Sequence, residues 1–219
     1  MTTVDDLLLR LRAAATVNDP FIGEATVGDM RRRSPLWPQH DKWQRIASTD
    51  VTDVPPRRVE EYRYFTDRDT AGLPVVFVFD SSGGPTAVRV YSSRDLVADR
   101  APLLPVVDGL APELPEDDVL RKYFASLPDP DPASSASLFA HDGYIQHSDG
   151  RRFTGHAQLL EDFTTMKRNK GGGIHLRHAR IGDNGHTLVL ECLVPSGRPA
   201  VVVYERDGRD RMRAVRIAL

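Results

Sequence analysis

A histidine in the second half of the chain stands where a strand would turn it toward a hydrophobic core. The segment LFAHDGYIQHSDGRRFTG, residues 138–155, places Ile145 and His147 two positions apart. Side chains alternate along a strand, so a strand that buries Ile145 also turns His147 inward. An imidazole there can act as a general base near neutral pH, since its ordinary pKa is about 6.5. It can equally be a structural histidine bonded to the backbone.

A second histidine is a candidate for pairing with a carboxylate across a hairpin. The segment HLRHARIGDNGHTLVLECLV, residues 175–194, contains Asn184-Gly185, the dipeptide most typical of a two-residue turn. With these residues as the turn, His178 lies opposite Glu191, and a carboxylate there would orient the imidazole and raise its pKa. The pair could instead be an ordinary polar contact on a solvated face, because the other face is more apolar. A one-residue shift of the turn would remove the pairing.

The histidines do not have the spacing of a metal site. Six of the seven lie between residues 141 and 186, but His175 and His178 would point to opposite faces of one strand. A His-Glu-x-x-His motif, a cysteine pair and an Asp-rich calcium loop are all missing from the sequence. The glycines at 171–173 follow a helical pattern, which is wrong for cradling phosphate. We therefore expect no metal and no cofactor.

The composition is ordinary for a soluble globular protein. The chain has 219 residues, 40% of them hydrophobic and 27% charged, with a formal net charge of −2. This balance offers no basic surface for nucleic acid or an anionic membrane, and no apolar stretch approaches the roughly 18 residues of a membrane span. The single cysteine and an acidic start, MTTVDD, favour the cytoplasm over export. Only four of the 29 basic residues are lysines, which hints at a GC-rich bacterial genome.

Periodicity predicts the elements that carry these residues. One stripe of an amphipathic helix is formed by Val119, Leu120, Tyr123, Phe124 and Leu127. The Tyr123 side chain therefore faces inward. Asp131-Pro132 is typical of the start of a short second helix, and a third is marked by Leu159, Leu160, Phe163 and Met166. Three or four strands follow, so the pattern is α+β.

The two halves of the chain resemble each other. PVVFVFDSSGGPTAVRVY at 74–91 is similar to AVVVYERDGRDRMRAVRIA at 200–218, and VDDLLLRLRAAA at 4–15 is similar to EDDVLRKYFASL at 116–127. Prolines between the halves indicate an extended linker. We predict a tandem of related domains at 1–104 and 115–219, joined by residues 105–114. The first domain would be truncated or degenerate, without a counterpart of the His147 segment.

The second half also resembles a known superfamily. YFASLPDPD at 123–131, the segment that contains His147, and the closing hairpin resemble nuclear transport factor 2-like proteins, among them SnoaL-like polyketide cyclases, ketosteroid isomerases and limonene-epoxide-hydrolase-like enzymes. The resemblance implies two cone domains, each a curved antiparallel sheet with packing helices. It gives Tyr123 the place of the isomerases' oxyanion-binding tyrosine and His147 that of their catalytic aspartate. The second oxyanion acid falls near Val202, so half of that site is missing, and Leu11 stands at the tyrosine position of the first domain.

The resemblance implies a SnoaL-like enzyme that performs cyclisation or isomerisation by general acid–base chemistry, without a cofactor. Its substrate would be a small apolar carbonyl or polyketide-like compound, with His147 as the base and Tyr123 as the oxyanion donor, and His178 with Glu191 as a second candidate pair. One alternative is a non-catalytic small-molecule-binding or dimerisation module. Another is an epoxide hydrolase or cyclase, which would need an acid such as Glu161 or Glu191. A homodimer and an intramolecular pseudo-dimer both agree with the repeat.

Overall fold

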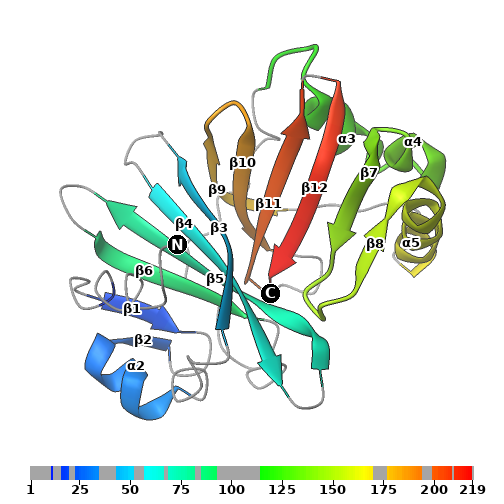
Figure 1. The fold of residues 1–219 in the computed structure, drawn as a ribbon. Coiled ribbons are helices and arrows are strands. Elements are labelled where there is room, and N and C mark those ends of the chain that lie inside the picture. The colour runs from blue at the N-terminus through cyan, green and yellow to red at the C-terminus, as the bar shows by residue number, and fades with distance from the viewer. Residues whose placement is uncertain are drawn as a thin grey trace. The chain divides into compact units, whose positions relative to one another are not determined.

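The computed structural model of the chain contains two six-stranded sheets, each with its own helices (Figure 1). It describes residues 11, 16–19, 23–34, 43–51, 57–66, 69–81, 85–92, 114–169, 177–193, 199–208 and 210–218. The chain divides into two compact units, one mostly of residues 1–103 and the other mostly of residues 104–217. The predicted linker at 105–114 lies outside the described residues except for Leu114.

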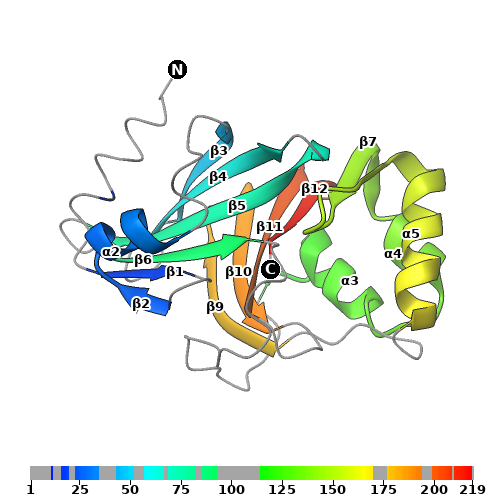
Figure 2. The same cartoon turned by 90° about the horizontal axis from the view of Figure 1, so that it is seen from below.

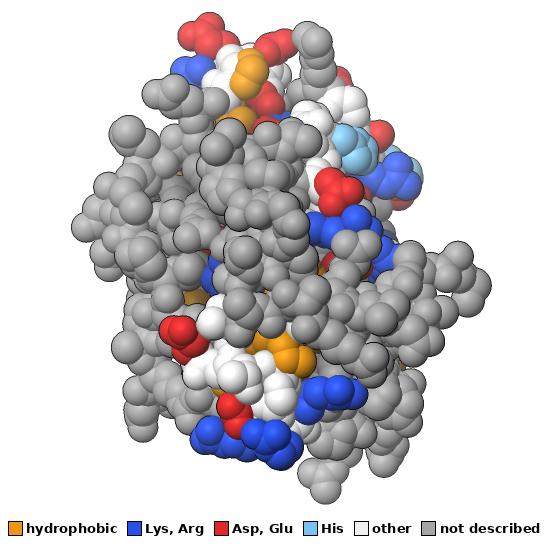
Figure 3. All heavy atoms as spheres, turned by 90° about the vertical axis from the view of Figure 1, so that its left-hand side faces the viewer, with side chains coloured by type: hydrophobic (Ala, Val, Ile, Leu, Met, Phe, Trp, Pro, Cys, Tyr) orange, Lys and Arg blue, Asp and Glu red, His pale blue; other side chains and the backbone are white. Residues whose placement is uncertain are grey.

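The sheet of the first unit has the strand order β2-β1-β6-β5-β4-β3. Its strands are β1 (Thr16–Asp19), β2 (Gly23–Ala25), β3 (Trp43–Val51), β4 (Arg57–Thr66), β5 (Asp69–Ser81) and β6 (Pro85–Ser92). A short helix, α2 (Val27–Arg33), follows β2 and begins where the Thr26 side chain accepts a hydrogen bond from the Asp29 amide. The last turn of α2 carries three exposed arginines. Figure 3 shows basic side chains gathered at the lower end of the face that it draws.

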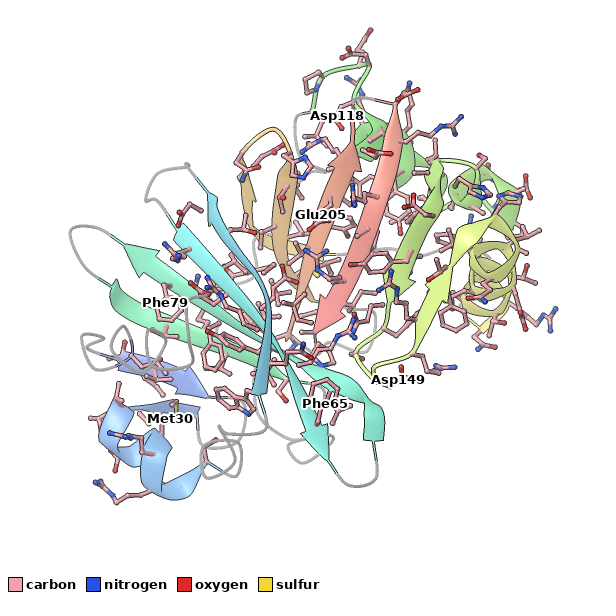
Figure 4. The ribbon with its side chains drawn as sticks, in the orientation of Figure 1. Met30, Phe65, Phe79, Asp118, Asp149 and Glu205 are labelled. Atoms are coloured by element: carbon pink, nitrogen blue, oxygen red, sulfur yellow. The ribbon has the colours of Figure 1, made fainter. Side chains whose placement is uncertain are left out.

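Aromatic side chains fill one face of this first sheet. The rings of Trp43, Tyr62 and Phe77 lie 5.5–6.0 Å apart between centroids. Met30 of α2 belongs to the same buried cluster as Phe79 of β5, and both are labelled in Figure 4. Leu11 is also fully buried in this cluster. At the position where the sequence resemblance expects a tyrosine, the first unit therefore has an apolar core residue.

The sheet of the second unit has the order β8-β7-β12-β11-β10-β9. Its strands are β7 (Phe139–Gln146), β8 (Arg152–Thr154), β9 (Arg177–Asp183), β10 (Thr187–Leu193), β11 (Pro199–Asp207) and β12 (Arg211–Ala218). Three helices lie together on one side of it, as Figure 2 shows: α3 (Val119–Ser126), α4 (Pro132–Ala136) and α5 (Gly155–Asn169). The predicted α+β class is confirmed, and α3 and α5 lie where the periodicity placed them. Helix α4 begins at the predicted Pro132 but ends at Ala136 and not near Ala140, because Phe139 and Ala140 already belong to β7.

Both sheets connect their strands in the same way. In each unit an Ala-Val-Arg segment of the last strand pairs in parallel with an early strand, so that Val88 is opposite Val17 and Val215 is opposite Ile145. The expectation that the first half has no counterpart of the His147 segment is therefore wrong. Strand β1 takes that place, and Asp19 occupies the register position of His147. With only four residues, β1 is too short to show a strand periodicity in the sequence.

A buried lysine holds the end of α3 against α5. Lys167 of α5 is 2% exposed, and its Nζ donates to the carbonyl oxygens of Ser126, Asp129 and Asp131 at 3.0, 2.6 and 2.8 Å. These three carbonyls span the connection from α3 to α4. Ser126 is the last residue of α3, so one ammonium group joins the end of α3 and the following loop to α5.

A buried arginine holds the beginning of α3. The Nη2 atom of Arg206, on β11, lies 2.9 Å from Asp118 and 2.7 Å from Asp183. Asp118, labelled in Figure 4, caps α3 by accepting a hydrogen bond from the Leu120 amide. Burial lowers the pKa of Arg206, but the hydrogen bonds to Asp183 and Asp118 outweigh it and raise the pKa overall. Arg206 therefore fixes α3 to the sheet while remaining charged.

We expect Arg206→Met to lower the free energy of unfolding by about 2–3 kcal/mol, because it leaves two carboxylates without their cation. The cost stays below that of a fully buried pair since both carboxylates keep some solvent contact. Urea denaturation followed by circular dichroism measures the change. Arg213→Met, at an exposed position of β12, is the control and should change stability by less than about 0.5 kcal/mol. Equal stability of the two variants would contradict the role of Arg206.

Candidate functional site

A carboxylate lies on the buried face of α5. Leu159, Asp162 and Phe163 follow one another at helical spacing, and Asp162 is only 5% exposed while its two neighbours are fully buried. The Asp162 Oδ2 atom lies 2.8 Å from Nε2 of His147. A buried carboxylate requires such a partner, because its desolvation is otherwise unfavourable.

His147 is held from three directions. Its amide donates to the carbonyl of Arg151 at 2.9 Å, its ring packs edge-on against Phe153 with centroids 5.4 Å apart, and its Nε2 meets Asp162. Ile145, two residues earlier on β7, is buried with 1% exposure. The imidazole thus reaches the helix that covers the sheet, while its Nδ1 makes no hydrogen bond to any described residue.

Tyr123 lies on α3 within a cluster of aromatic rings. Its ring centroid is 5.9 Å from that of Phe139, 6.2 Å from Phe163 and 5.9 Å from Tyr204. Burial raises the pKa of Tyr123, and the charge of Asp162 raises it further. Asp162 therefore bonds His147 directly, and its charge also acts on Tyr123. The rings of Tyr123 and His147 make no direct ring contact with each other among the contacts of the described residues.

The sheet face beneath α3 carries one more phenol. Tyr204 is opposite Leu188 in the β10–β11 pairing, and Val202 is opposite Leu190, so all four side chains share that face. Val202 is buried and apolar at the place where the resemblance expects an acid. Burial raises the pKa of Tyr204, with additional contributions from Tyr123 and Cys192. Burial also raises the pKa of the Cys192 thiol, to about 12. These groups all stay neutral near pH 7.

The predicted pairing of His178 with Glu191 is wrong. In the structure His178 is opposite Cys192, and Glu191 is opposite Arg180, with an irregularity between the pairs. The turn is centred on Gly185-His186, one residue later than predicted. The side chain of Asn184 accepts hydrogen bonds from the amides of His186 and Thr187 at 3.0 and 2.7 Å, which fixes this later turn.

The two acids considered for epoxide chemistry do not reach the site. Glu191 is fully buried opposite Val201, and this register places it on the other face of the sheet from Tyr204. Glu161 is exposed on α5. The side chain of His178 lies outside the described residues. Of the four residues predicted for the site, His147 bonds Asp162, Tyr123 is acted on by the charge of the same carboxylate, and Glu191 lies on the other face of the sheet.

Sequence reasoning missed Asp162. The stripe that predicts α5 consists of apolar residues only. Asp162 nevertheless lies on the same face of the helix, three residues after Leu159 and next to Phe163. An acidic residue inside an apolar stripe was the available signal, because an unpaired charge is rarely buried.

Within the described part of the chain, no group of three or more His, Cys, Asp or Glu side chains could hold a metal ion. No helix in that part is long and apolar enough to cross a membrane.

No family model matches the chain, but several solved structures resemble about half of it. A protein from Catenulispora acidiphila with a ketosteroid isomerase-like fold, in complex with trimethylamine, has 16% identity and a TM-score of 0.39, covering 49% of this chain and 85% of its own. An NTF2-like protein from Cytophaga hutchinsonii has 10% identity and a TM-score of 0.38, with coverages of 49% and 92%. A SnoaL-like protein from Burkholderia thailandensis has 14% identity and a TM-score of 0.39, with coverages of 46% and 91%. These neighbours come from the superfamily that the sequence resembles.

The buried phenol of Tyr123 predicts a loss of stability at high pH. Because the folded state raises its pKa above the ordinary value of about 10, the stabilisation is complete below pH 10 and is lost as the pH rises beyond it. We expect the free energy of unfolding to fall more steeply above pH 10 in the unmodified protein than in Tyr123→Phe, by up to about 1.4 kcal/mol per pH unit. Urea titrations between pH 8 and 11 measure both slopes. Parallel curves would contradict this prediction.

Proposed function

We propose that the second unit is a SnoaL-like enzyme that performs cofactor-independent general acid–base chemistry on a small, largely apolar carbonyl compound. The observation that carries the proposal is the 2.8 Å contact between His147 and Asp162 beside the buried phenol of Tyr123. A base, a group that orients it and a hydrogen-bond donor are the three parts that enolisation requires. The sequence resemblance supports the same two roles for Tyr123 and His147.

His147 takes the proton. Its Nε2–H donates to Asp162, which leaves Nδ1 with a lone pair for a proton on the carbon next to the substrate carbonyl. The Asp162 carboxylate stabilises the imidazolium that forms, as in other His–Asp pairs. The electron pair of the broken C–H bond moves to the carbonyl oxygen and gives an enolate.

Tyr123 stabilises that enolate oxygen. Burial keeps the phenol protonated, so it remains a donor at neutral pH, and the surrounding rings of Phe139 and Phe163 exclude water from the interaction. Return of the proton from His147 to a different carbon completes an isomerisation. Attack of the enolate carbon on a second carbonyl, with that oxygen then protonated by the imidazolium, completes a cyclisation.

The first experiment follows hydrogen exchange in deuterated water by NMR, using β,γ-unsaturated ketones and β-diketones as substrates. We expect His147→Ala to slow the protein-dependent exchange about 100- to 10,000-fold, because a general base contributes that much. His156→Ala removes an exposed histidine of α5 and is the control that should keep the full rate. Unchanged exchange in His147→Ala with an intact fold would exclude His147 as the base. Binding of the ketones without any exchange would favour a non-catalytic binding module.

The second experiment tests how Asp162 acts. We expect Asp162→Asn to keep substrate affinity and to reduce the exchange rate at least tenfold, because the amide cannot stabilise the imidazolium. Glu161→Gln removes one charge from the adjacent, exposed position of the same helix and should leave the rate unchanged. Equal effects of the two variants would show that Asp162 acts only through the net charge of α5.

A further inference from the structure

An arginine lies directly opposite His147 on the hairpin formed by β7 and β8. The pairing of these strands places Ile145 opposite Phe153, and two residues further on the His147 amide donates to the Arg151 carbonyl at 2.9 Å. Directly opposite residues of an antiparallel pair share one face, with Cβ atoms about 5 Å apart. The contact of His147 with Asp162 shows that this face is turned toward α5. Arg151 therefore extends from the hairpin on the side of the candidate base.

The loop between the two strands fixes this arrangement. Residues 148–150 separate His147 from Arg151, and Gly150 has a φ of 87°. A three-residue hairpin loop typically ends in a residue of this left-handed conformation, which glycine adopts without strain. Asp149, labelled in Figure 4, marks the position of the loop. The turn itself thus sets the arginine opposite the histidine.

Phe153 contacts both side chains. The Arg151 Cζ atom lies over the Phe153 ring at 5.8 Å from its centroid, and the His147 ring meets the same ring edge-on at 5.4 Å. Arginine can combine a ring contact with binding of a carboxylate through two hydrogen bonds, because its N–H donors form a planar fork. Arg151 is exposed whereas His147 is partly buried, so the guanidinium lies at the solvent side of the imidazole.

We propose that Arg151 binds a carboxylate of the substrate, and that the compound on which His147 acts is therefore a keto acid with an apolar body. This inference rests on the proposed function, because it takes His147 as the base. Asp162 is engaged by His147, so the imidazolium formed in the proposed step is balanced by that carboxylate and Arg151 adds a further positive charge. A carboxylate on the substrate balances the charge of Arg151.

The next residue along β8 provides a matched control. Arg152 is also exposed, but it lies opposite Gln146 and therefore on the other face of the hairpin. Its Cζ atom lies 3.6 Å from the centroid of the Tyr144 ring, and its Nε donates to the Thr154 hydroxyl. The two arginines thus share charge, exposure and an aromatic contact, and differ in the face that they occupy.

The test compares 4,6-dioxoheptanoate, a β-diketone with a carboxylate at one end, with its methyl ester. Hydrogen exchange in deuterated water, followed by NMR, gives kcat/KM for both compounds. We expect the unmodified protein to prefer the acid about 10- to 100-fold, because a charge-assisted pair of hydrogen bonds contributes about that much. Arg151→Met should lose this preference, and Arg152→Met should retain it.

Equal kcat/KM for the acid and the ester in the unmodified protein would overturn the inference. A preference for the acid that survives in Arg151→Met, or that falls equally in Arg152→Met, would also overturn it. The comparison of acid with ester in the unmodified protein needs no variant, so it decides the question even if Arg151→Met fails to fold.

The outcome is separable from that of the proposed function, because binding is measured independently by isothermal titration calorimetry. Binding of the acid in preference to the ester that depends on Arg151, in a protein that catalyses no exchange, would support the carboxylate site and overturn the enzyme. Exchange that needs His147 but is equal for the acid and the ester would support the enzyme and overturn the carboxylate site.

Discussion

The buried carboxylate of Asp162 is the constraint around which the second unit is arranged. A charge on the inner face of a helix, next to Leu159 and Phe163, is unfavourable unless a donor reaches it. His147 provides that donor. The hydrogen bond from the His147 amide to the Arg151 carbonyl closes the turn after β7 and holds His147 in place. The same contact fixes the imidazole against α5 and lets the carboxylate act on the phenol of Tyr123. The contact between His147 and Asp162 thus satisfies a buried charge and also orients an imidazole that could take part in catalysis.

The helix that carries Tyr123 is fixed at both ends by buried cations. Arg206 binds the capping carboxylate at its beginning, and Lys167 binds the carbonyl of its last residue and one in the loop that follows. An eight-residue helix would be marginal alone, so its position depends on these tertiary contacts. Each cation comes from a different element, β11 or α5, and α3 is therefore tied to both the sheet and the longest helix. The position of the Tyr123 ring follows from these two ties.

The sequence correctly predicts the elements with strong periodicity. It fails where a polar side chain forms hydrogen bonds with the backbone and shifts a turn. The apolar stripes of α3 and α5, and the Asp-Pro start of α4, predicted these helices, and the strand alternation around Ile145 predicted the burial that the structure has. The β9–β10 turn was misplaced by one residue because Asn184 uses its side chain to bond the following amides. Asp162 was missed because a polar residue in an apolar stripe is read as an interruption. The bond that explains it comes from a residue 15 positions away.

Strand β1 pairs with β6 in the same way as β7 pairs with β12, and the residue just after each of these pairings differs in chemical type between the two units. In each parallel pair the strands are joined by main-chain hydrogen bonds, and an apolar residue, Val17 or Ile145, lies within the paired segment. The pairing ends one residue before Asp19 in the first unit and one residue before His147 in the second. Exchange of side chains at that position leaves the strand pairing untouched. Two sheets that share this pairing can therefore hold an acid at this position in one unit and an imidazole in the other, without a difference in architecture.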